Sequence, residues 1–220
     1  MTATHAQSRA RTPRLVWVVA AMVLLVVLTT MLDWRLFHWL AETDPVRVER
    51  LKGRDWYQFL RAMGYLPAWG VLAFGIALCD LGRRSGIGRG VLVVVAPIAA
   101  GAAAELAKLI ISRERPIRDG VVQNEGAYTW KGLFQGFVDG GNLGMPSSHA
   151  AVAFGGAAML GILFPPVRWL ALVLAAGCGL TRLLSGAHFA SDVAVGAILG
   201  VVLAWLLGRS VAPRPGGGGL

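Results

Sequence analysis

The chain has 220 residues, of which 55% are apolar and only 15% are charged, and its mean hydropathy is +0.60. Soluble domains usually carry more charge, so this composition excludes an ordinary soluble protein. The net charge of +9 would suit a nucleic-acid-binding protein, but arginines also collect on the cytoplasmic side of membrane proteins. The long apolar runs favour the second explanation, and no nucleic-acid partner is expected.

Apolar runs predict membrane-spanning helices. A helix needs about 20 mostly apolar residues to cross a bilayer, and six segments approach that length. They are residues 15–32, 59–81, 91–111, 147–164, 167–184 and 188–207. The fold class predicted is therefore all-α: a polytopic membrane protein with a bundle of about six transmembrane helices.

The predicted organisation is one membrane domain with a tail at each end. Residues 1–14 form a basic tail, residues 15–208 the membrane domain, and residues 209–220 a flexible, glycine-rich tail. The first span resembles a signal peptide because basic residues precede it. No clear small-residue cleavage site follows it, however, so we expect a retained anchor.

Small residues within the spans predict close helix contacts. Residues 99–104 and 155–158 consist of alanine and glycine alone, and Glu105 follows the first run directly. Such residues let helix backbones approach closely in a membrane. We expect both runs to lie at helix–helix interfaces.

Short arginine-rich segments predict the orientation of the bundle. Both tails, residues 82–90 and the link at residues 165–168 carry arginines without a single acid. If the spans alternate, all four segments lie on one side, which the positive-inside rule makes cytoplasmic. We therefore expect a multi-pass protein of the cell inner (plasma) membrane, with residues 33–58 and 112–145 on the extracytoplasmic side.

Residues 33–58 mix aromatic and leucine side chains with charges, most densely between Trp34 and Leu40. This pattern is typical of a short helix that lies in the membrane interface. An ordinary solvated loop explains the pattern equally well, and both forms remain open.

Three clusters of polar residues lie at span ends on the extracytoplasmic side. In the first, Lys108 and Arg115 are seven residues apart, so they would share a face if the helix continued that far. Glu105 precedes Lys108 by three residues, which predicts an ion pair that positions the lysine. Arg113 and Arg118 are interpreted as cations that snorkel at the membrane boundary.

The second cluster opens the fourth predicted span with Pro146, Ser147, Ser148 and His149, after a glycine-rich approach at residues 140–144. Proline and serine favour a helix start, where free N–H groups and the helix dipole attract a phosphate. Simple helix capping would explain the serines, but it gives no reason for a histidine at the same end.

The third cluster joins the last two spans and contains Arg182, His188 and Asp192. His188 and Asp192 are four residues apart, so on a helix they would share a face. A carboxylate there can bind one ring nitrogen of the histidine and leave the other free to attack. Arg182 can form bidentate hydrogen bonds to phosphate oxygens. Together, the clusters supply the cations, nucleophile and proton donor that phosphoryl transfer needs.

The three clusters resemble the signature of the type-2 phosphatidic acid phosphatase family, which shares a superfamily with vanadium haloperoxidases. That signature is K-x-x-x-x-x-x-R-P, then P-S-G-H, then S-R-x-x-x-x-x-H-x-x-x-D. In this chain it is matched by Lys108, Arg115 and Pro116, by Pro146, Ser147 and His149, and by Arg182, His188 and Asp192. Two positions depart from it, because Ser148 replaces the usual glycine and Thr181 the usual serine.

The resemblance implies roles for these residues. His188 would attack phosphorus and form a phosphohistidine, Asp192 would orient His188, and His149 would protonate the leaving oxygen. The phosphate would be held by Lys108, Arg115, Ser147, Ser148 and Arg182. The resemblance also implies the six-helix bundle and a reaction without metal or other cofactor.

The function predicted is that of an integral-membrane lipid phosphatase. Undecaprenyl diphosphate, phosphatidylglycerophosphate, phosphatidate and lipid A phosphate all fit the resemblance, and the sequence does not choose among them. The alternative is a transporter or flippase that binds a lipid phosphate without hydrolysis. A vanadate-dependent haloperoxidase is a third possibility that the hydrophobic context disfavours.

Overall fold

The computed structural model describes residues 11–82 and 88–211, and most of them are helical. The helices are α2 (Arg11–Leu40), α3 (Pro45–Lys52), α4 (Asp55–Ala62), α5 (Leu66–Cys79), α6 (Gly88–Ile111), α7 (Ser148–Leu163), α8 (Arg168–Leu184) and α9 (Ala190–Val211). Two 3-10 turns, η1 (Gln135–Phe137) and η2 (Pro165–Val167), and an antiparallel pair of strands, β1 (Ile117–Arg118) and β2 (Val121–Val122), complete the described elements. The fold is therefore all-α, as the composition predicted.

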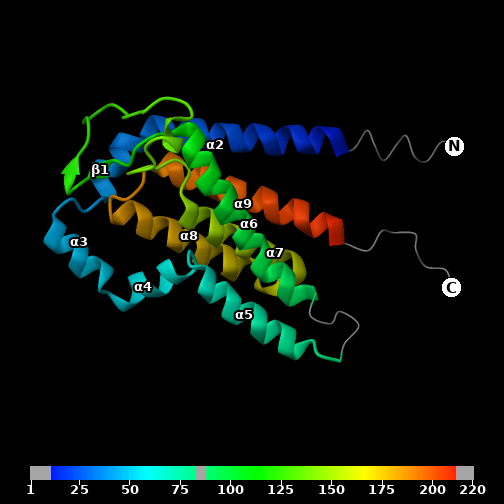
Figure 1. The fold of residues 1–220 in the computed structure, drawn as a ribbon. Coiled ribbons are helices and arrows are strands. Elements are labelled where there is room, and N and C mark those ends of the chain that lie inside the picture. Colours follow the sequence, from blue (N-terminus) through cyan, green and yellow to red (C-terminus); the bar gives the residue numbers. More distant parts are fainter. Residues whose placement is uncertain (1–10, 83–87, 212–220) are drawn as a thin grey trace.

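The long helices lie side by side along one direction (Figure 1). The short elements α3, α4, β1 and β2 gather at one end of this bundle, and the starts of α2 and α6 lie at the other end with the ends of α5 and α9. Long connections therefore lie at one end, which is where the sequence placed its polar clusters.

Membrane crossing is supported by four helices that are long and apolar enough: Leu15–Leu40, Gly88–Ile111, Pro165–Leu184 and Ala190–Arg209. The pair α4 and α5 makes a fifth span if it is counted as one, although it bends by 66° at a short break. The helix α7 has 16 residues, about 24 Å, which is shorter than the roughly 30 Å hydrocarbon core. The chain is a multi-pass membrane protein, but two of the six predicted spans are irregular.

The break corrects the prediction of one continuous span over residues 59–81. Pro67 occupies the first turn of α5, where its missing N–H group has no consequence. In a continuous helix its ring would clash with the preceding turn, so α4 and α5 form separately. The turn between them approaches α7 closely, because a Cβ on Gly64 would lie 2.8 Å from Cδ2 of His149.

The first helix is longer than predicted. Residues 34–40 continue α2 and form neither a separate interfacial helix nor a loop. The next helix, α3, begins where the Asp44 side chain accepts hydrogen bonds from the N–H groups of Val46 at 2.8 Å and Arg47 at 3.2 Å. Helical structure also enters both predicted tails, since α2 begins at Arg11 and α9 ends at Val211. The rest of these tails, residues 1–10 and 212–220, lies outside the described residues.

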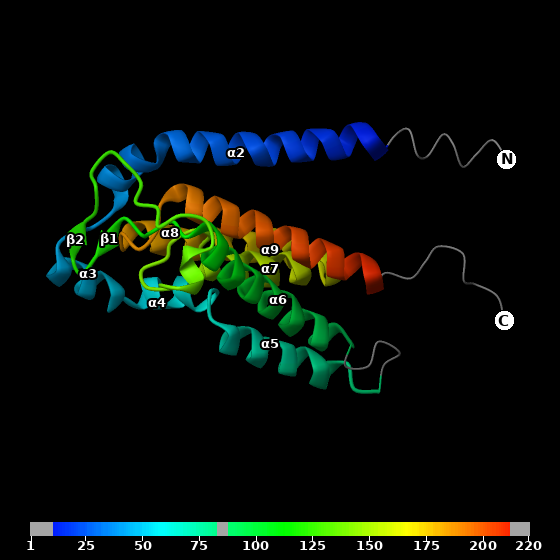
Figure 2. The ribbon, with the colours of Figure 1, turned by 45° about the horizontal axis from the view of Figure 1, so that its top comes forward.

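The helix α2 lies along the outside of the bundle (Figures 1 and 2). No residue of its apolar 18-residue window is buried by the rest of the described chain. Between residues 15 and 40, the buried side chains are those of Asp33 and Phe37. The C-terminal part of α2 therefore makes the principal attachment to the bundle.

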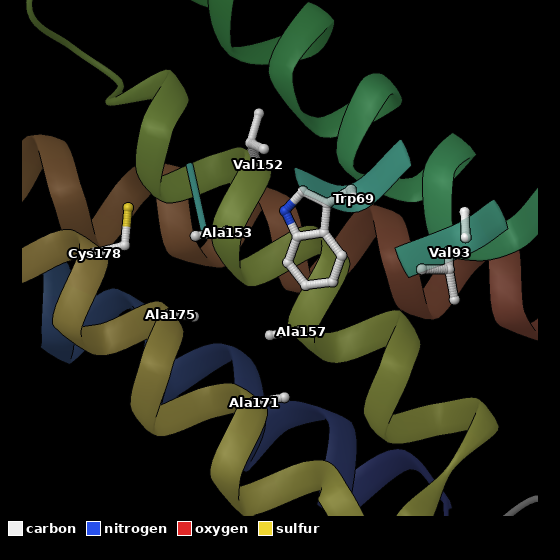
Figure 3. Close-up of a cluster of buried hydrophobic side chains, with 9 residues drawn as sticks. Trp69, Val93, Val152, Ala153, Ala157, Ala171, Ala175 and Cys178 are labelled. Carbon is white, nitrogen blue, oxygen red and sulfur yellow. The ribbon is translucent and has the colours of Figure 1, made fainter. Parts of the chain in front are cut away.

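Small residues bring the remaining helices close to α7. A Cβ on Gly155 would lie 2.9 Å from Cβ of Ala100, and one on Gly156 would lie 2.4 Å from Cε2 of Trp69. Figure 3 shows the Trp69 indole beside α7. It lies in a cluster of buried apolar side chains that come from α7, Ala153 among them, and from neighbouring helices. The predicted small-residue interfaces are thus confirmed, and they hold α7 at the centre of the bundle.

Candidate active site

Lys108 joins two of the sequence clusters. It lies in the last turn of α6, and only 5% of the residue is exposed. Its Nζ donates to Oε1 of Glu105 at 2.7 Å, so the predicted ion pair is confirmed. The same Nζ donates to Oγ of Ser148 at 3.0 Å, which ties the end of α6 to the start of α7.

Arg115 reaches the same region by a different path from the one expected. The helix α6 ends directly before Ser112, whose φ of 58° turns the chain away from the helix, so Arg115 does not continue its face. The Arg115 N–H group donates to the Asn142 carbonyl at 2.9 Å, and its Nε donates to the Leu143 carbonyl at 3.1 Å. These bonds hold Arg115 beside the glycine-rich approach to α7.

The start of α7 rests against α9. Ser147 is the N-cap residue, and its N–H group donates to the Asp192 carbonyl at 2.9 Å. A Cβ on Gly196 would lie 2.4 Å from the Ser147 carbonyl oxygen, so this approach requires glycine. The buried Oγ of Ser147 has no hydrogen-bond partner among the described residues. Such a helix start offers backbone N–H groups and a hydroxyl to an anion.

His188 and Asp192 face each other in the interior. Nδ1 of His188 lies 3.5 Å from Oδ2 of Asp192, and both side chains are almost fully buried. The Phe189 N–H group donates to the same Oδ2 at 2.9 Å, which fixes the orientation of the carboxylate. Because Nδ1 faces Asp192, the other ring nitrogen, Nε2, is the one available for chemistry.

The imidazole of His188 is held neutral. Burial lowers the pKa of His188 to about 4, Asp192 opposes this shift, and the charges of Arg182 and Arg115 add to it. A neutral ring keeps a lone pair at neutral pH, which a nucleophile needs. The same interactions indicate that both arginines lie within electrostatic range of His188.

Arg182 and His149 complete the group of residues that the sequence singled out. Both side chains have a buried nitrogen without a hydrogen-bond partner among the described residues, Nε in Arg182 and Nε2 in His149. The ring of His149 interacts electrostatically with Arg182, Lys108 and His188. All eight selected residues therefore belong to one polar cluster, in which cations surround two histidines.

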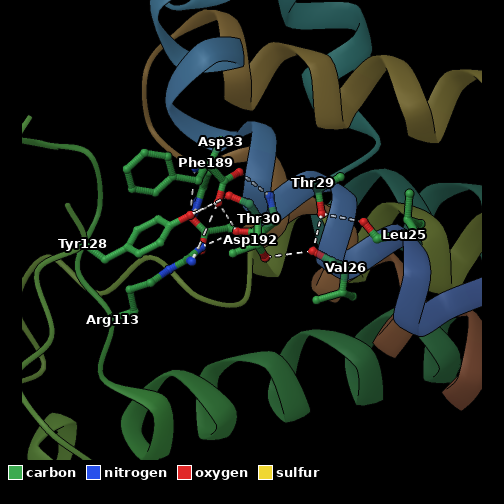
Figure 4. A network of polar contacts seen from close by, with 11 residues as sticks. Leu25, Val26, Thr29, Thr30, Asp33, Arg113, Tyr128, Phe189 and Asp192 are labelled. Carbon is green, nitrogen blue, oxygen red and sulfur yellow. Dashed lines mark hydrogen bonds and ion pairs between the residues drawn. The ribbon is translucent and has the colours of Figure 1, made fainter. Parts of the chain in front are cut away.

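Arg113 was interpreted as a snorkelling cation, and this interpretation is wrong. Its side chain is 2% exposed, and its Nη2 donates to Oγ of Ser191 at 2.7 Å and to Oδ1 of Asp192. Its Nη1 lies 3.8 Å from Oδ2 of Asp33, and Figure 4 shows Arg113 pointing toward Asp33 and Asp192. Arg118 keeps the predicted surface role, because its side chain is 51% exposed.

Asp33 brings the first helix into the same network. The Ser191 N–H group donates to Oδ1 of Asp33 at 2.8 Å, and Oγ of Ser191 donates to Oδ2. The hydroxyl of Tyr128 lies 3.0 Å from Oδ2, and its ring centre lies 4.7 Å from Cζ of Arg113 (Figure 4). Burial, together with the charge of Asp33, raises the pKa of Tyr128 to about 12, so this phenol remains a donor.

Sequence reasoning missed this network for an identifiable reason. The predicted first span ends at Leu32, so the sequence places Asp33 in the following connection. An acid inside an apolar helix needs a buried partner, and extending the span would have flagged Asp33 as a functional candidate. No comparable signal separates Arg113 from Arg118, because both follow the same span.

The described residues contain no group of three or more histidine, cysteine, aspartate or glutamate side chains arranged to hold a metal ion. The cluster instead concentrates lysine and arginine around the histidines. Such a set of side chains suits an anion with several oxygens, and phosphate is the common biological example.

A bundle of membrane-crossing helices with a buried histidine–carboxylate pair among cations defines a membrane protein with a site suited to phosphate. The model of the PAP2 superfamily matches residues 89–214, more than half of the chain. The chain therefore belongs to the PAP2 superfamily, a family of membrane phosphatases, and the resemblance noted from the sequence is confirmed.

One curated relative shows the same relationship over a shorter stretch. The bacitracin transport permease protein BcrC of Bacillus licheniformis is 41% identical over 59 residues, which is 27% of this chain and 29% of that protein. The match thus covers less than a third of the relative's length. No solved structure is detectably similar to the chain.

Proposed function

We propose that the protein hydrolyses a phosphomonoester or diphosphate of a membrane lipid through a phosphohistidine intermediate. The observation that carries this proposal is the buried pair of His188 and Asp192 surrounded by cations, with His149 in the same cluster. Binding an anion requires the cations alone. A neutral imidazole backed by a carboxylate beside a second histidine is suited to covalent catalysis.

In the first step, Nε2 of His188 forms a bond to phosphorus while the bond from phosphorus to the leaving oxygen breaks. His149, which takes up a proton when the phosphate anion binds beside it, transfers that proton to the leaving oxygen, so the product leaves as an alcohol or a lipid phosphate. The ring of His188 becomes positively charged, and Asp192 stabilises that charge through Nδ1.

In the second step, water attacks the phosphohistidine. His149 now removes a proton from the water, the phosphorus–nitrogen bond breaks, and its electron pair returns to His188. Inorganic phosphate leaves, and both histidines regain their starting protonation states.

The phosphate oxygens are bound by the residues around the pair. Arg115 and Arg182 supply planar guanidinium groups, and Lys108 supplies a compact charge. Ser147 and Ser148 supply hydroxyls and the N–H groups of a helix start. These cations neutralise the charge that a metal ion neutralises in other phosphatases, so the reaction needs no divalent metal.

The site lies at the end of the bundle that the positive-inside rule assigns to the extracytoplasmic side of the inner membrane. A lipid phosphate can reach it with its tail still in the bilayer. Among the candidate lipids, this side favours recycling of a lipid carrier, so undecaprenyl diphosphate ranks before phosphatidylglycerophosphate, phosphatidate and lipid A phosphate.

A second candidate function is transport of a lipid phosphate without hydrolysis. The observation that favours it is the name of the relative from Bacillus licheniformis, which is called a transport permease protein. Under this alternative, the cations would bind the phosphate and the histidine–carboxylate pair would have no chemical role.

Release of inorganic phosphate separates the two functions. Purified protein is mixed with each candidate lipid, and phosphate is measured for the wild type and for His188→Ala. Hydrolysis requires release by the wild type and loss of turnover in His188→Ala, with the variant still inserted and folded. Near-native activity of His188→Ala would refute the proposed mechanism, and absence of release from every lipid would favour transport.

A further inference from the structure

Arg61 is a cation at the site that neither the family signature nor the family match at residues 89–214 includes. It lies in the last turn of α4, just before the break that separates α4 from α5. Its Nε is buried and has no hydrogen-bond partner, and none of the carboxylates in the described ranges forms an ion pair with it. Arg61 is half-buried, and an arginine without a counter-ion at the membrane boundary is a candidate for binding an anionic ligand.

Arg61 reaches His149 through one aromatic ring. The centre of its guanidinium group lies 5.1 Å from the centre of the Tyr65 ring, and the Tyr65 ring lies 5.3 Å from the His149 ring in an edge-to-face arrangement. Electrostatic interaction also links Arg61 to His149 and to Arg182. The cation therefore belongs to the part of the site that contains His149.

The backbone around Arg61 packs against the helices α7 and α8. The Arg61 carbonyl and the His149 carbonyl both lie near Sγ of Cys178, at 3.8 Å and 3.9 Å. A Cβ on Gly64 would come within 3.0 Å of Sγ of Cys178 and closer still to the His149 ring. Because the turn has no room to shift inward, the position of Arg61 relative to His149 is set by packing.

This position matters because His149 donates its proton to the leaving oxygen in the proposed mechanism. When the substrate is a lipid phosphomonoester, the leaving group is a neutral alcohol. When the substrate is a lipid diphosphate, the leaving group is a lipid phosphate that carries negative charge. A cation beside His149 stabilises only the second leaving group, and charge-assisted hydrogen bonds of this kind are strong.

Resting on the proposed function, we propose that Arg61, packed on Tyr65, binds the second phosphate of a lipid diphosphate and makes diphosphates the preferred substrates. Tyr65 is 40% exposed whereas His149 is largely enclosed, so this subsite lies between the reacting phosphate and the surface. The order along the substrate is then the terminal phosphate at His188, the lipid-linked phosphate at Arg61, and the lipid tail beyond it.

The test compares a polyprenyl diphosphate with the polyprenyl monophosphate of the same chain length, in the same detergent. Arg61→Ala is measured beside Arg61→Lys and beside Arg54→Ala, which removes a charge from an exposed position just before the same helix. We expect Arg61→Ala to lower kcat/KM for the diphosphate by about 10- to 100-fold and to change the monophosphate value by about twofold or less. Arg61→Lys should recover part of the loss, and Arg54→Ala should match the wild type.

A second measurement remains informative even if the Arg61→Ala variant is partly unfolded. Inorganic diphosphate and inorganic phosphate are used as inhibitors of monophosphate hydrolysis, and the ratio of their inhibition constants does not depend on how much enzyme is folded. Arg61→Ala should weaken inhibition by diphosphate and leave inhibition by phosphate unchanged.

If Arg61→Ala lowers kcat/KM equally for both lipids and leaves the ratio of the two inhibition constants unchanged, the proposed subsite is wrong and Arg61 is a structural residue. No loss on either lipid would overturn the subsite as well. Failure of the wild type to release phosphate from either lipid would instead overturn the proposed function on which the subsite rests.

Discussion

Nη2 of Arg113 donates to Oδ1 of Asp192, while Oδ2 of the same carboxylate faces Nδ1 of His188. One oxygen of Asp192 thus accepts from a buried cation, and the other lies 3.5 Å from a buried imidazole. Arg113 does not contact the reacting atoms in this arrangement. Its predicted contribution is to position Asp192, and through it His188.

Arg113→Gln should lower kcat/KM by about 100-fold or more, because Asp192 loses the cation that holds it. The variant should also be destabilised by about 3–5 kcal/mol, since Asp33 and Asp192 remain buried without compensation. Thermal unfolding in detergent and phosphate release measure the two effects. Arg118→Gln, at an exposed position, serves as the control and should behave like the wild type.

The same network makes a prediction about pairs of substitutions. Adding Asp33→Asn to Arg113→Gln removes one of the two uncompensated carboxylates, so the double variant should be more stable than Arg113→Gln alone. A double-mutant cycle of unfolding measurements reports this coupling. Simple addition of the two losses would show that Arg113 and Asp33 do not interact.

Asp33→Ala should reduce phosphatase activity strongly, although Asp33 lies outside the family-matched region at residues 89–214. The reason is that Ser191, next to Asp192, loses the acceptor of both its N–H group and its hydroxyl. Thr29→Val is the matched control on α2, since its hydroxyl bonds only to carbonyls of its own helix. Equal activity of the two variants would contradict a role for Asp33 in the site.

The low pKa of His188 predicts how stability depends on pH. The folded protein holds this ring with a pKa of about 4, whereas an unfolded chain would protonate it near 6.5. Between these values the unfolded state binds the extra proton, so this contribution to stability is present above pH 6.5 and is lost as the pH falls toward 4. Unfolding temperatures at pH 7 and pH 5 should therefore differ more in the wild type than in His188→Asn.

Activity should persist in excess chelator. The site surrounds its histidines with lysine and arginine, whereas hard divalent cations require oxygen ligands from carboxylates. Phosphate release is measured before and after treatment with a chelator, followed by magnesium. Complete loss that magnesium restores would contradict a metal-independent reaction.

The orientation of the site can be tested by labelling single cysteines in intact cells, after replacing Cys79 and Cys178. A cysteine at Glu125, whose side chain is 72% exposed at the active-site end, should react with an impermeant reagent. A cysteine at Ser85, which lies outside the described residues, should be protected because residues 82–90 are expected on the cytoplasmic side. The reverse pattern would place the chemistry in the cytoplasm.

The sequence by itself determined the class of fold and the family. Apolar runs define helices without reference to any partner, because every backbone polar group in a membrane helix is satisfied within the helix. Local geometry also made the ion pair of Lys108 with Glu105 predictable, since the two residues lie one turn apart. His188 lies in the turn before α9, so its approach to Asp192 does not come from the shared helical face that the spacing predicted.

The tertiary structure alone decided which cations lie inside. Arg113 and Arg118 look alike in the sequence, but the turn at Ser112 directs only Arg113 toward Asp192. Asp33 and Ser191 are 158 residues apart, so no local pattern could pair them. Burial of a charge depends on partners brought together by packing, and packing between distant helices is not encoded in the spacing of neighbouring residues.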